Sequence, residues 1–125
     1  MVRSVLIVDD SRVVREALCE LFTREGEFDV CGEAENGRDA VQRARELYPD
    51  LIVTDLSMPV MNGIEETRLL KQLMPAVPVI IYTAHGDRYV EKEARAAGAS
   101  AVISKSEPVA NLVEKAKSLF DEIAA

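Results

Sequence analysis

VLIVDDS, residues 5–11, is the stretch that decides the fold. Four consecutive apolar residues, the pattern of a strand buried on both faces, end at two adjacent carboxylates, Asp9 and Asp10. Neighbouring anions beside an apolar interior repel each other and lose hydration, so they need a cation or strong hydrogen-bond donors between them. The stretch therefore predicts a buried strand with a charged site at its carboxyl end.

Four further short runs extend this pattern along the chain. They are FDVCGE (28–33), which alternates as an edge strand does, LIV (51–53), VPVIIY (77–82) and AVI (101–103). Stretches with helical periodicity lie between these runs, and the fourth, around residues 88–97, has the least distinct apolar face. Strands that alternate with helices predict an α/β fold, a doubly wound parallel sheet with helices on both faces. At a length of 125 residues we expect one domain, spanning 1–125.

The composition limits the kinds of protein that the chain can be. The formal net charge is −7 and the basic residues are spread along the sequence, so we expect no direct nucleic-acid binding. No apolar run approaches the roughly 20 residues of a membrane helix, and the one before Asp9 is too short for a signal peptide. We therefore expect a cytoplasmic protein without membrane contact. Cys19 and Cys31 lack the spacing of a zinc site or a disulfide framework, so we interpret them as small buried hydrophobes.

Polar residues follow the strands of the expected sheet. In open parallel sheets, ligands bind beyond the carboxyl ends of the strands, where the strand order reverses. At these ends the sequence places Asp9 and Asp10 after the first strand, Asp55 after the third, Thr83 after the fourth and Lys105 after the fifth. We therefore expect these five side chains to lie at one edge of the sheet.

Three carboxylates in one crevice form a hard, all-oxygen site that suits Mg²⁺. Lys105 would supply a positive charge for a phosphoryl oxygen, and the Thr83 hydroxyl would donate a hydrogen bond to another. With both groups present, a carboxylate can act as a nucleophile and form an acyl phosphate. Asp55 is the best candidate, because it ends a buried strand and precedes LSMPVMNG (56–63), an irregular loop with backbone groups available to metal and phosphate.

The segments that carry these residues resemble the receiver domain of two-component response regulators. The matching segments, in order and spacing, are VLIVDDS (5–11), PDLIVTDLSMPVMNG (49–63), VPVIIYTA (77–84) and GASAVISK (98–105). The similarity covers nearly the whole chain, and VCGEAENG (30–37) looks most similar to receivers that usually precede a LuxR-like helix-turn-helix. The resemblance implies a flavodoxin-like (βα)5 sandwich with strand order 2-1-3-4-5.

The same resemblance implies a role for each acidic residue of the edge. Asp55 would be the phosphoacceptor, and Mg²⁺ would be bound by Asp10, Asp55 and the carbonyl of Ser57. Asp9 would assist the metal through water. The domain itself would be a signalling module that assists its own phosphorylation and dephosphorylation, and not an enzyme.

The remaining groups and the partners follow from the resemblance as well. Thr83 and Lys105 would contact the phosphoryl group, joined by backbone N–H groups near Leu56 and Ala84. The donor would be a phosphohistidine on a sensor histidine kinase or a phosphotransfer protein. Phosphorylation would change the surface around the fourth helix and fifth strand, which would signal to an output domain or partner protein, with a homodimer as one possible product.

The chain departs from the family's pattern at two positions and leaves a third open. Ser106 follows Lys105 where proline is usual, so we expect a trans bond there, because a cis bond before a non-proline residue costs about 2.5–4 kcal/mol. Val102 stands where the fifth strand often carries an aromatic ring, which puts the family's switching mechanism in doubt. His85, two residues after Thr83, either flanks the phosphoryl group with Ser57 or is simply exposed.

Three other classes of protein compete with this interpretation. A phosphatase of the haloacid-dehalogenase type would need an acid two residues beyond its nucleophile, where this chain has Ser57. A dinucleotide-binding domain would need glycines after the first strand, where this chain has DDSRVV (9–14). A receiver-like interaction module that is never phosphorylated is disfavoured by the complete set of acids, threonine and lysine, while Val102 leaves it some room.

Overall fold

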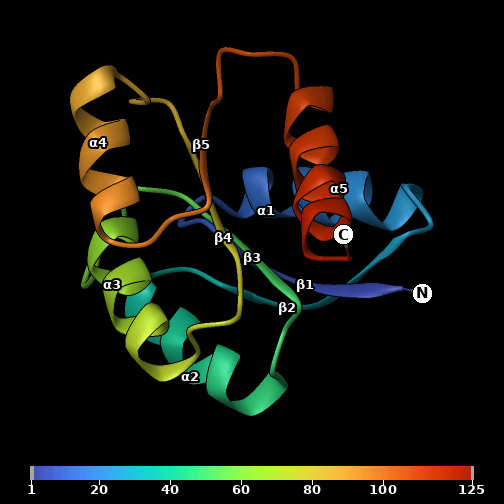
Figure 1. The fold of residues 1–125 in the computed structure, drawn as a ribbon, viewed down its shortest axis with the longest axis horizontal. Coiled ribbons are helices and arrows are strands. Elements are labelled where there is room, and N and C mark those ends of the chain that lie inside the picture. Colours follow the sequence, from blue (N-terminus) through green and yellow to red (C-terminus); the bar gives the residue numbers. More distant parts are fainter. Residues whose placement is uncertain (1, 125) are drawn as a thin grey trace.

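The computed structural model describes residues 2–124, within which five strands alternate with five helices (Figure 1). The elements, in chain order, are β1 (Arg3–Val8), α1 (Arg12–Arg24), β2 (Phe28–Ala34), α2 (Gly37–Leu47), β3 (Leu51–Thr54), α3 (Gly63–Leu73), β4 (Val79–Thr83), α4 (Arg88–Ala96), β5 (Ala101–Ser104) and α5 (Ala110–Ala124). All neighbouring strands are parallel, and their order is β2-β1-β3-β4-β5. The expected fold class, including the strand order, is confirmed.

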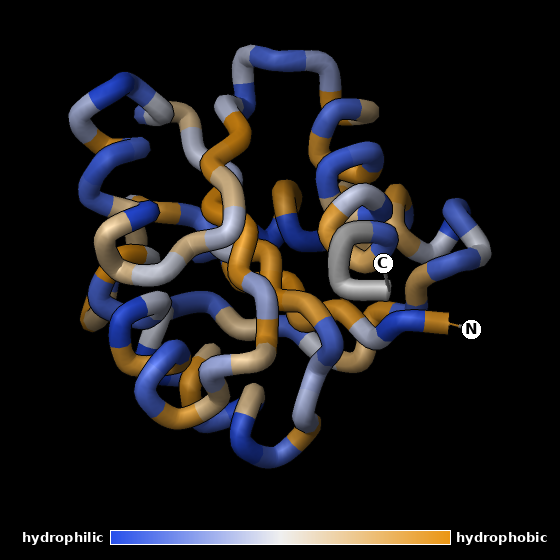
Figure 2. Tube along the Cα trace, in the orientation of Figure 1, coloured by the Kyte–Doolittle hydropathy of each residue, from blue (hydrophilic) through white to orange (hydrophobic). Residues whose placement is uncertain are grey.

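The sheet divides the apolar interior into two layers. Alternate residues of β1 point to opposite faces: Val5 and Ile7 pack with α1 and α5, while Leu6 and Val8 pack with α2 and α3. Figure 2 shows the apolar strands running through the centre of the molecule between more polar helices. The four-residue apolar run is therefore continuous because both of its faces are covered.

Helices α1 to α4 begin at side chains that cap their free N–H groups. Ser11 caps α1, Asn36 caps α2, Asn62 caps α3 and Asp87 caps α4, each by accepting a hydrogen bond from a backbone N–H in the first turn. Gly26, at φ +64°, follows the end of α1 in the left-handed conformation that glycine adopts readily. None of the helices in residues 2–124 is long and apolar enough to cross a membrane.

Three details of the sheet refine the sequence-based expectations. Thr83 is the last residue of β4 and not the first residue after it. The pairing of β1 with β2 shifts between Val5 and Leu6, so Cys31 lies at an irregularity that the alternating pattern did not predict. Tyr82 packs in the layer of α1 and α5, opposite the cluster that holds Val102, as strand alternation predicts.

The amino ends of the central strands are joined by polar contacts. Asp50, just before β3, accepts hydrogen bonds from the Ser4 N–H at 2.8 Å and from the Ser4 hydroxyl at 3.2 Å. The Asp50 N–H donates to the Ser4 carbonyl at 2.9 Å. These contacts join the amino ends of β1 and β3, at the edge of the sheet opposite the predicted site.

Candidate functional site

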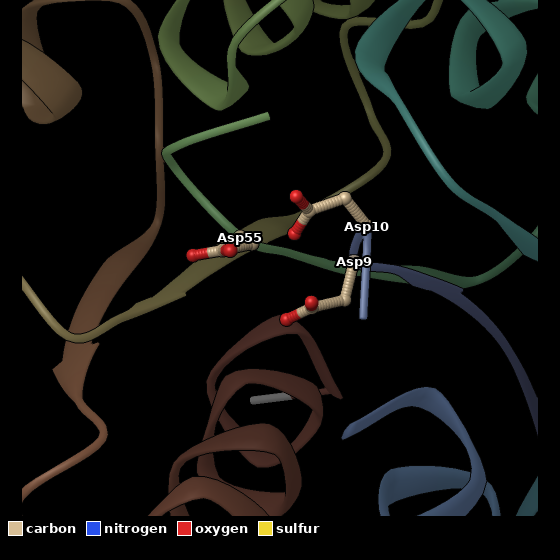
Figure 3. Close-up of side chains that lie close together, drawn as sticks. All are labelled: Asp9, Asp10 and Asp55. Carbon is tan, nitrogen blue, oxygen red and sulfur yellow. The ribbon is translucent and has the colours of Figure 1, made fainter. Parts of the chain in front are cut away.

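Three carboxylates meet at the carboxyl edge of the sheet. Asp9 and Asp10 directly follow β1 and Asp55 directly follows β3, and one carboxylate oxygen from each lies within 4.8 Å of the others (Figure 3). Asp9 and Asp55 are buried, whereas Asp10 is exposed. Backbone bonds from Asp9 N–H to Ala34 and from Asp55 N–H to Val8 extend the sheet by one residue and fix both positions. The expected convergence of the three acids is observed.

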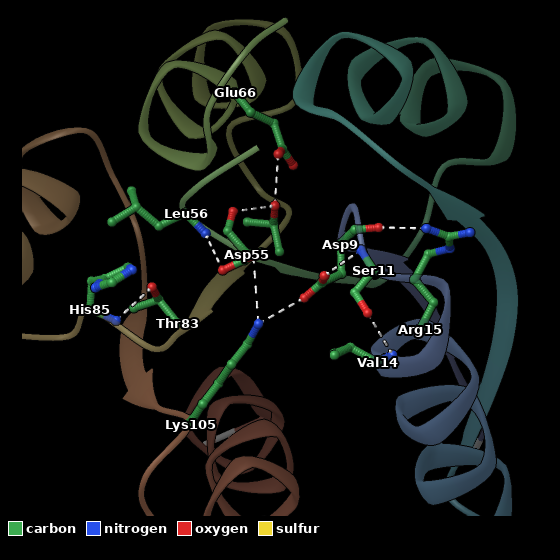
Figure 4. A network of polar contacts seen from close by, with 11 residues as sticks. Asp9, Ser11, Val14, Arg15, Asp55, Leu56, Glu66, Thr83, His85 and Lys105 are labelled. Atoms are coloured by element: carbon green, nitrogen blue, oxygen red, sulfur yellow. Dashed lines mark hydrogen bonds and ion pairs between the residues drawn. The ribbon is translucent and has the colours of Figure 1, made fainter. Parts of the chain in front are cut away.

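Lys105 reaches across the sheet to two of these acids. Its Nζ lies 3.0 Å from Oδ2 of Asp9 and 3.5 Å from Oδ2 of Asp55, and Figure 4 shows the side chain extending between them. Its backbone N–H donates to the Thr83 carbonyl at 2.8 Å, which anchors the residue at the end of β5. Burial lowers the pKa of Lys105, but the hydrogen bond to Asp9 and the charges of Asp55 and Asp9 outweigh this effect and raise the pKa. The ammonium group therefore stays charged.

The Asp55 carboxylate has a different partner on each oxygen. Oδ1 accepts a hydrogen bond from the Leu56 N–H at 2.8 Å, while Oδ2 faces Lys105. Burial, the largest cause, and the charge of Asp9 raise the pKa of Asp55 above its ordinary value, against the opposing effect of Lys105. One ammonium offsets only part of the negative charge of three carboxylates. The all-oxygen set therefore fits a hard dication such as Mg²⁺.

Asp9 is held by groups of the loop and helix that follow it. Its Oδ1 accepts from the Ser11 N–H at 2.9 Å, and its backbone carbonyl accepts from Nη1 of Arg15 at 2.7 Å. The largely buried Arg15 side chain also pairs with Glu33 at 3.2 Å. Sequence analysis missed Arg15, whose only signal is its position one turn into the helix that follows the acidic pair.

The other predicted site residues lie at the same edge with fewer contacts. The hydroxyl of Thr83, which is fully buried, accepts from the His85 N–H at 3.1 Å, which leaves its own hydrogen available for a ligand. His85 is exposed, as one of the two readings of this residue has it. Ser57 is exposed and lines an open groove together with Asp10. The Lys105–Ser106 bond is trans, as expected, because residues 2–124 contain no cis peptide bond.

The loop between β3 and α3 is shaped by close contact with Asp55. A Cβ on Gly63 would overlap the Asp55 carbonyl oxygen and lie 3.1 Å from the Cα of Leu56. The Gly63 N–H donates to the Leu56 carbonyl at 2.8 Å, so α3 begins directly against the phosphoacceptor candidate. The close approach requires glycine at this position.

Sequence analysis also missed Glu66, a fully buried carboxyl group in α3. Its Oε1 lies 2.7 Å from the hydroxyl of Thr54, which in turn donates to the Asp55 carbonyl at 3.0 Å. The available signal was helical spacing, because Glu66 lies one turn before the buried Leu70 and three residues after Gly63. That spacing places an acid on the apolar face of the helix.

Comparison with known proteins gives this arrangement a family. Residues 5–117 match the response regulator receiver domain. The chain is 39% identical over 114 residues to the chemotaxis protein CheY of Thermotoga maritima, covering 91% of this chain and 94% of that protein. It is 40% identical over 101 residues to the transcriptional regulatory protein LnrK of Bacillus subtilis, covering 81% of this chain and 46% of that protein.

Solved structures give the same result. A LuxR-family two-component response regulator from Aurantimonas sp. superposes with a TM-score of 0.94 at 33% identity, over 98% of this chain and 87% of that one. A chain of the CheX–CheY–BeF3–Mg²⁺ complex from Borrelia burgdorferi superposes with a TM-score of 0.89 at 31% identity, over 94% and 89% of the two chains.

The chain belongs to the response regulator receiver domain family, whose members are phosphoacceptor domains of two-component signalling. Its relatives are of two kinds. It spans almost all of the CheY protein of Thermotoga maritima, but only about half of the transcriptional regulatory protein LnrK.

Proposed function

We propose that Asp55 accepts a phosphoryl group from the phosphohistidine of a sensor histidine kinase or a phosphotransfer protein. The observation that supports this most directly is the position of the Lys105 ammonium, 3.0 Å from Asp9 and 3.5 Å from Asp55. A fixed cation beside the candidate nucleophile is the group that phosphoryl transfer needs, because negative charge builds on the phosphoryl oxygens.

In the proposed step, a carboxylate oxygen of Asp55 attacks the phosphorus and the P–N bond to histidine breaks. The electron pair stays on the imidazole nitrogen, which takes up a proton from water, and Asp55 becomes an acyl phosphate. Lys105 and the Thr83 hydroxyl would bind phosphoryl oxygens, and the Leu56 N–H, which donates to Asp55 Oδ1 in this structure, would donate to one of them as well. The N–H near Ala84 would be a further donor.

The acidic cluster would hold Mg²⁺ through Asp10, Asp55 and the Ser57 carbonyl, with Asp9 contributing through water. When bound, Mg²⁺ would neutralise charge on the nucleophile and on the phosphoryl oxygens. The structure from Borrelia burgdorferi, which contains Mg²⁺ and BeF3 in a CheX–CheY complex, supports this assignment by similarity. It also supports a protein partner as the receiver of the signal.

The domain would be a signalling module and not an enzyme with a separate substrate, acting in the cytoplasm on an output domain or partner protein. The net charge of −7 supports the absence of direct nucleic-acid contact by this domain. A homodimer formed on phosphorylation would be one way for the domain to pass on its signal.

Labelling with acetyl phosphate and Mg²⁺, followed by intact-mass measurement, tests the proposal. We expect the wild type to gain one phosphoryl group and Asp55→Asn to gain none, because an amide cannot form the acyl phosphate. Asp87→Asn is the matched control, since asparagine caps α4 as well as aspartate does and should be labelled normally. Equal labelling of Asp55→Asn and wild type would refute the assignment of Asp55. An unlabelled wild type would point to the interaction module that is never phosphorylated.

A further inference from the structure

Glu66 is a buried carboxyl group with no charged partner within the described residues. Its side chain is 0% exposed, and Oε2 has no hydrogen-bond partner in the described part of the chain. Burial raises the pKa of Glu66 well above its ordinary value, and the Thr54 hydroxyl opposes this only in part. An isolated carboxylate in an apolar interior would lack the compensation that a buried charge needs. Burial without a compensating cation therefore favours the neutral, protonated form of this carboxyl group.

A protonated Glu66 allows both close contacts of the Thr54 hydroxyl to be hydrogen bonds. The Thr54 hydroxyl has a single hydrogen but two oxygens within reach, Glu66 Oε1 at 2.7 Å and the Asp55 carbonyl at 3.0 Å. If Glu66 were ionised, it would compete with the carbonyl for that hydrogen. A protonated Glu66 instead donates to the Thr54 oxygen, and Thr54 is then free to donate to Asp55. Both short distances become hydrogen bonds.

The hydrogen bonds that run from Glu66 through Thr54 form a relay, which ends on the peptide group between Asp55 and Leu56. The Asp55 carbonyl and the Leu56 N–H belong to the same planar peptide unit, so a bond that fixes one end fixes the direction of the other. At its second end this unit donates from Leu56 to Asp55 Oδ1 at 2.8 Å. Figure 4 shows Glu66 on the α3 side of Asp55, away from Lys105. The carbonyl of this peptide is thus held by Thr54 and Glu66 on the α3 side, and its N–H faces the site.

We infer that Glu66 is a positioning residue, whose protonated carboxyl group acts through Thr54 to aim the Leu56 N–H at the phosphoacceptor oxygen. This inference rests on the proposed function only for its effect on phosphorylation, because the orientation of the peptide exists before any phosphoryl group arrives. Glu66 touches neither the metal ligands nor the reacting atoms in the described contacts, so its effect is indirect.

The direct measurement is the amide chemical shift of Leu56 in the unphosphorylated, metal-free protein. Thr54→Val removes the hydroxyl at constant shape and should move this signal. Glu66→Met, which removes the donor and leaves Thr54 without the partner that fixes its rotamer, should move it in the same direction by a smaller amount. Glu66→Gln and Thr54→Ser are the matched controls, because an amide can donate to Thr54 and serine keeps the hydroxyl. Both should leave the signal near its wild-type position.

The double variant Thr54→Val/Glu66→Met tests whether Glu66 acts through Thr54. If the relay is correct, adding Glu66→Met to Thr54→Val moves the Leu56 signal no further, because the connection is already broken. An equal additional movement would show that Glu66 acts independently. An unmoved Leu56 signal in Glu66→Met, or the same movement in Glu66→Gln, would overturn the inference. Melting temperatures measured on every variant identify any that fail to fold. If Glu66→Met is one of them, the Thr54 pair still tests the link from Thr54 to Leu56, and an unmoved signal in Thr54→Val overturns the inference.

Labelling rates connect the relay to function. We expect Thr54→Val to slow labelling by acetyl phosphate roughly tenfold, less than the hundredfold or more that loss of a transition-state donor typically costs. Glu66→Gln and Thr54→Ser should remain close to the wild-type rate. If the wild type is not labelled at all, the proposed function fails while the Leu56 shifts still test the relay. If the wild type is labelled and the shifts do not move, only the relay is wrong.

Discussion

Gly63 has no side chain, and this allows the start of α3 to lie directly against the Asp55 carbonyl. We expect Gly63→Ala to destabilise the protein by about 1–3 kcal/mol or more, because the added methyl group must displace the Asp55 carbonyl. Phosphorylation should fall as well, since the same displacement tilts the peptide of Leu56. Thermal or denaturant unfolding gives the first effect and intact-mass labelling the second.

Gly86→Ala is the control for this prediction. A Cβ at Gly86 would meet nothing closer than 3.6 Å, and the residue has no left-handed φ, so alanine should be tolerated. If both substitutions changed stability by the same amount, close packing at Gly63 would not be the cause.

The buried Glu66 predicts a pH dependence of stability. Its folded-state pKa is raised above the ordinary 4.5, so between these two values the native state holds one more proton than the unfolded chain. Stability from this group is fully present below the ordinary pKa and is lost as pH rises toward the folded-state pKa. The free energy of unfolding should therefore fall in this window by up to about 1.4 kcal/mol per pH unit.

Glu66→Gln removes this titration and keeps the shape of the side chain. Denaturant unfolding of both proteins across a pH series should show the variant gaining on the wild type as pH rises above the ordinary glutamate pKa. Parallel stability curves for the two proteins would mean that Glu66 is not protonated in the native state.

Single residues also show how far sequence alone could go. The edge residues Asp9, Asp55 and Lys105 could be placed together, because the carboxyl ends of parallel strands converge whatever the helices do. Arg15 and Glu66 could not, because their contacts depend on how α1 and α3 rotate against the sheet. Helical spacing places Glu66 on the apolar face of α3, but the rotation that brings it to Thr54 is decided by packing.

Among the elements, α4 and β5 differ in how firmly they are attached. Ala94 is the only fully buried residue within α4, whereas β5 is paired with β4 along its whole length. Val102 in β5 packs beside Ile81 and is too short to swing between a buried and an exposed position. A change at the site should therefore act more on α4 than on β5.

Amide chemical shifts with and without BeF3 and Mg²⁺ test this expectation. We predict large changes at Ala84, at His85 and along α4, and small changes along Ala101–Ser104. Val102→Tyr, which restores an aromatic ring, should enlarge the response of β5. Comparable changes in β5 and at His85 of the wild type would show that an aromatic residue is not needed for switching.

The elements themselves were largely predictable, and the exceptions have local causes. Short apolar or alternating runs identify all five strands, because helices bury β1, β3 and β4 and partly cover the edge strands β2 and β5. The irregularity at Cys31 in β2 was not predictable, since β2 is an edge strand paired on one side only and its register is set by β1. Thr83 was placed one residue outside its strand, a difference within the usual uncertainty of strand ends.

For the molecule as a whole, the acidic cluster should make stability depend on Mg²⁺. A cation that binds the native state alone raises the free energy of unfolding, by about 2.7 kcal/mol at a hundredfold excess over its Kd. We expect Mg²⁺ to raise the melting temperature of the wild type, and Asp10→Asn to lose most of this gain. Asp87→Asn should keep it, since its acid lies outside the cluster. An equal gain in Asp10→Asn would contradict the proposed metal ligands.

The contacts between Ser4 and Asp50 lie at the amino ends of the strands, opposite the site, and this separation is useful for protein engineering. All the chemistry lies where the strands end, so the loops at their beginnings are free to carry foreign sequence. Gly26 lies in one of these loops, and a side chain built there would meet no atom within 4 Å. A fluorescent reporter or an affinity tag inserted beside Gly26, with the glycine kept because of its left-handed φ of +64°, would extend into solvent beyond the amino ends of the strands and leave the acidic cluster unchanged.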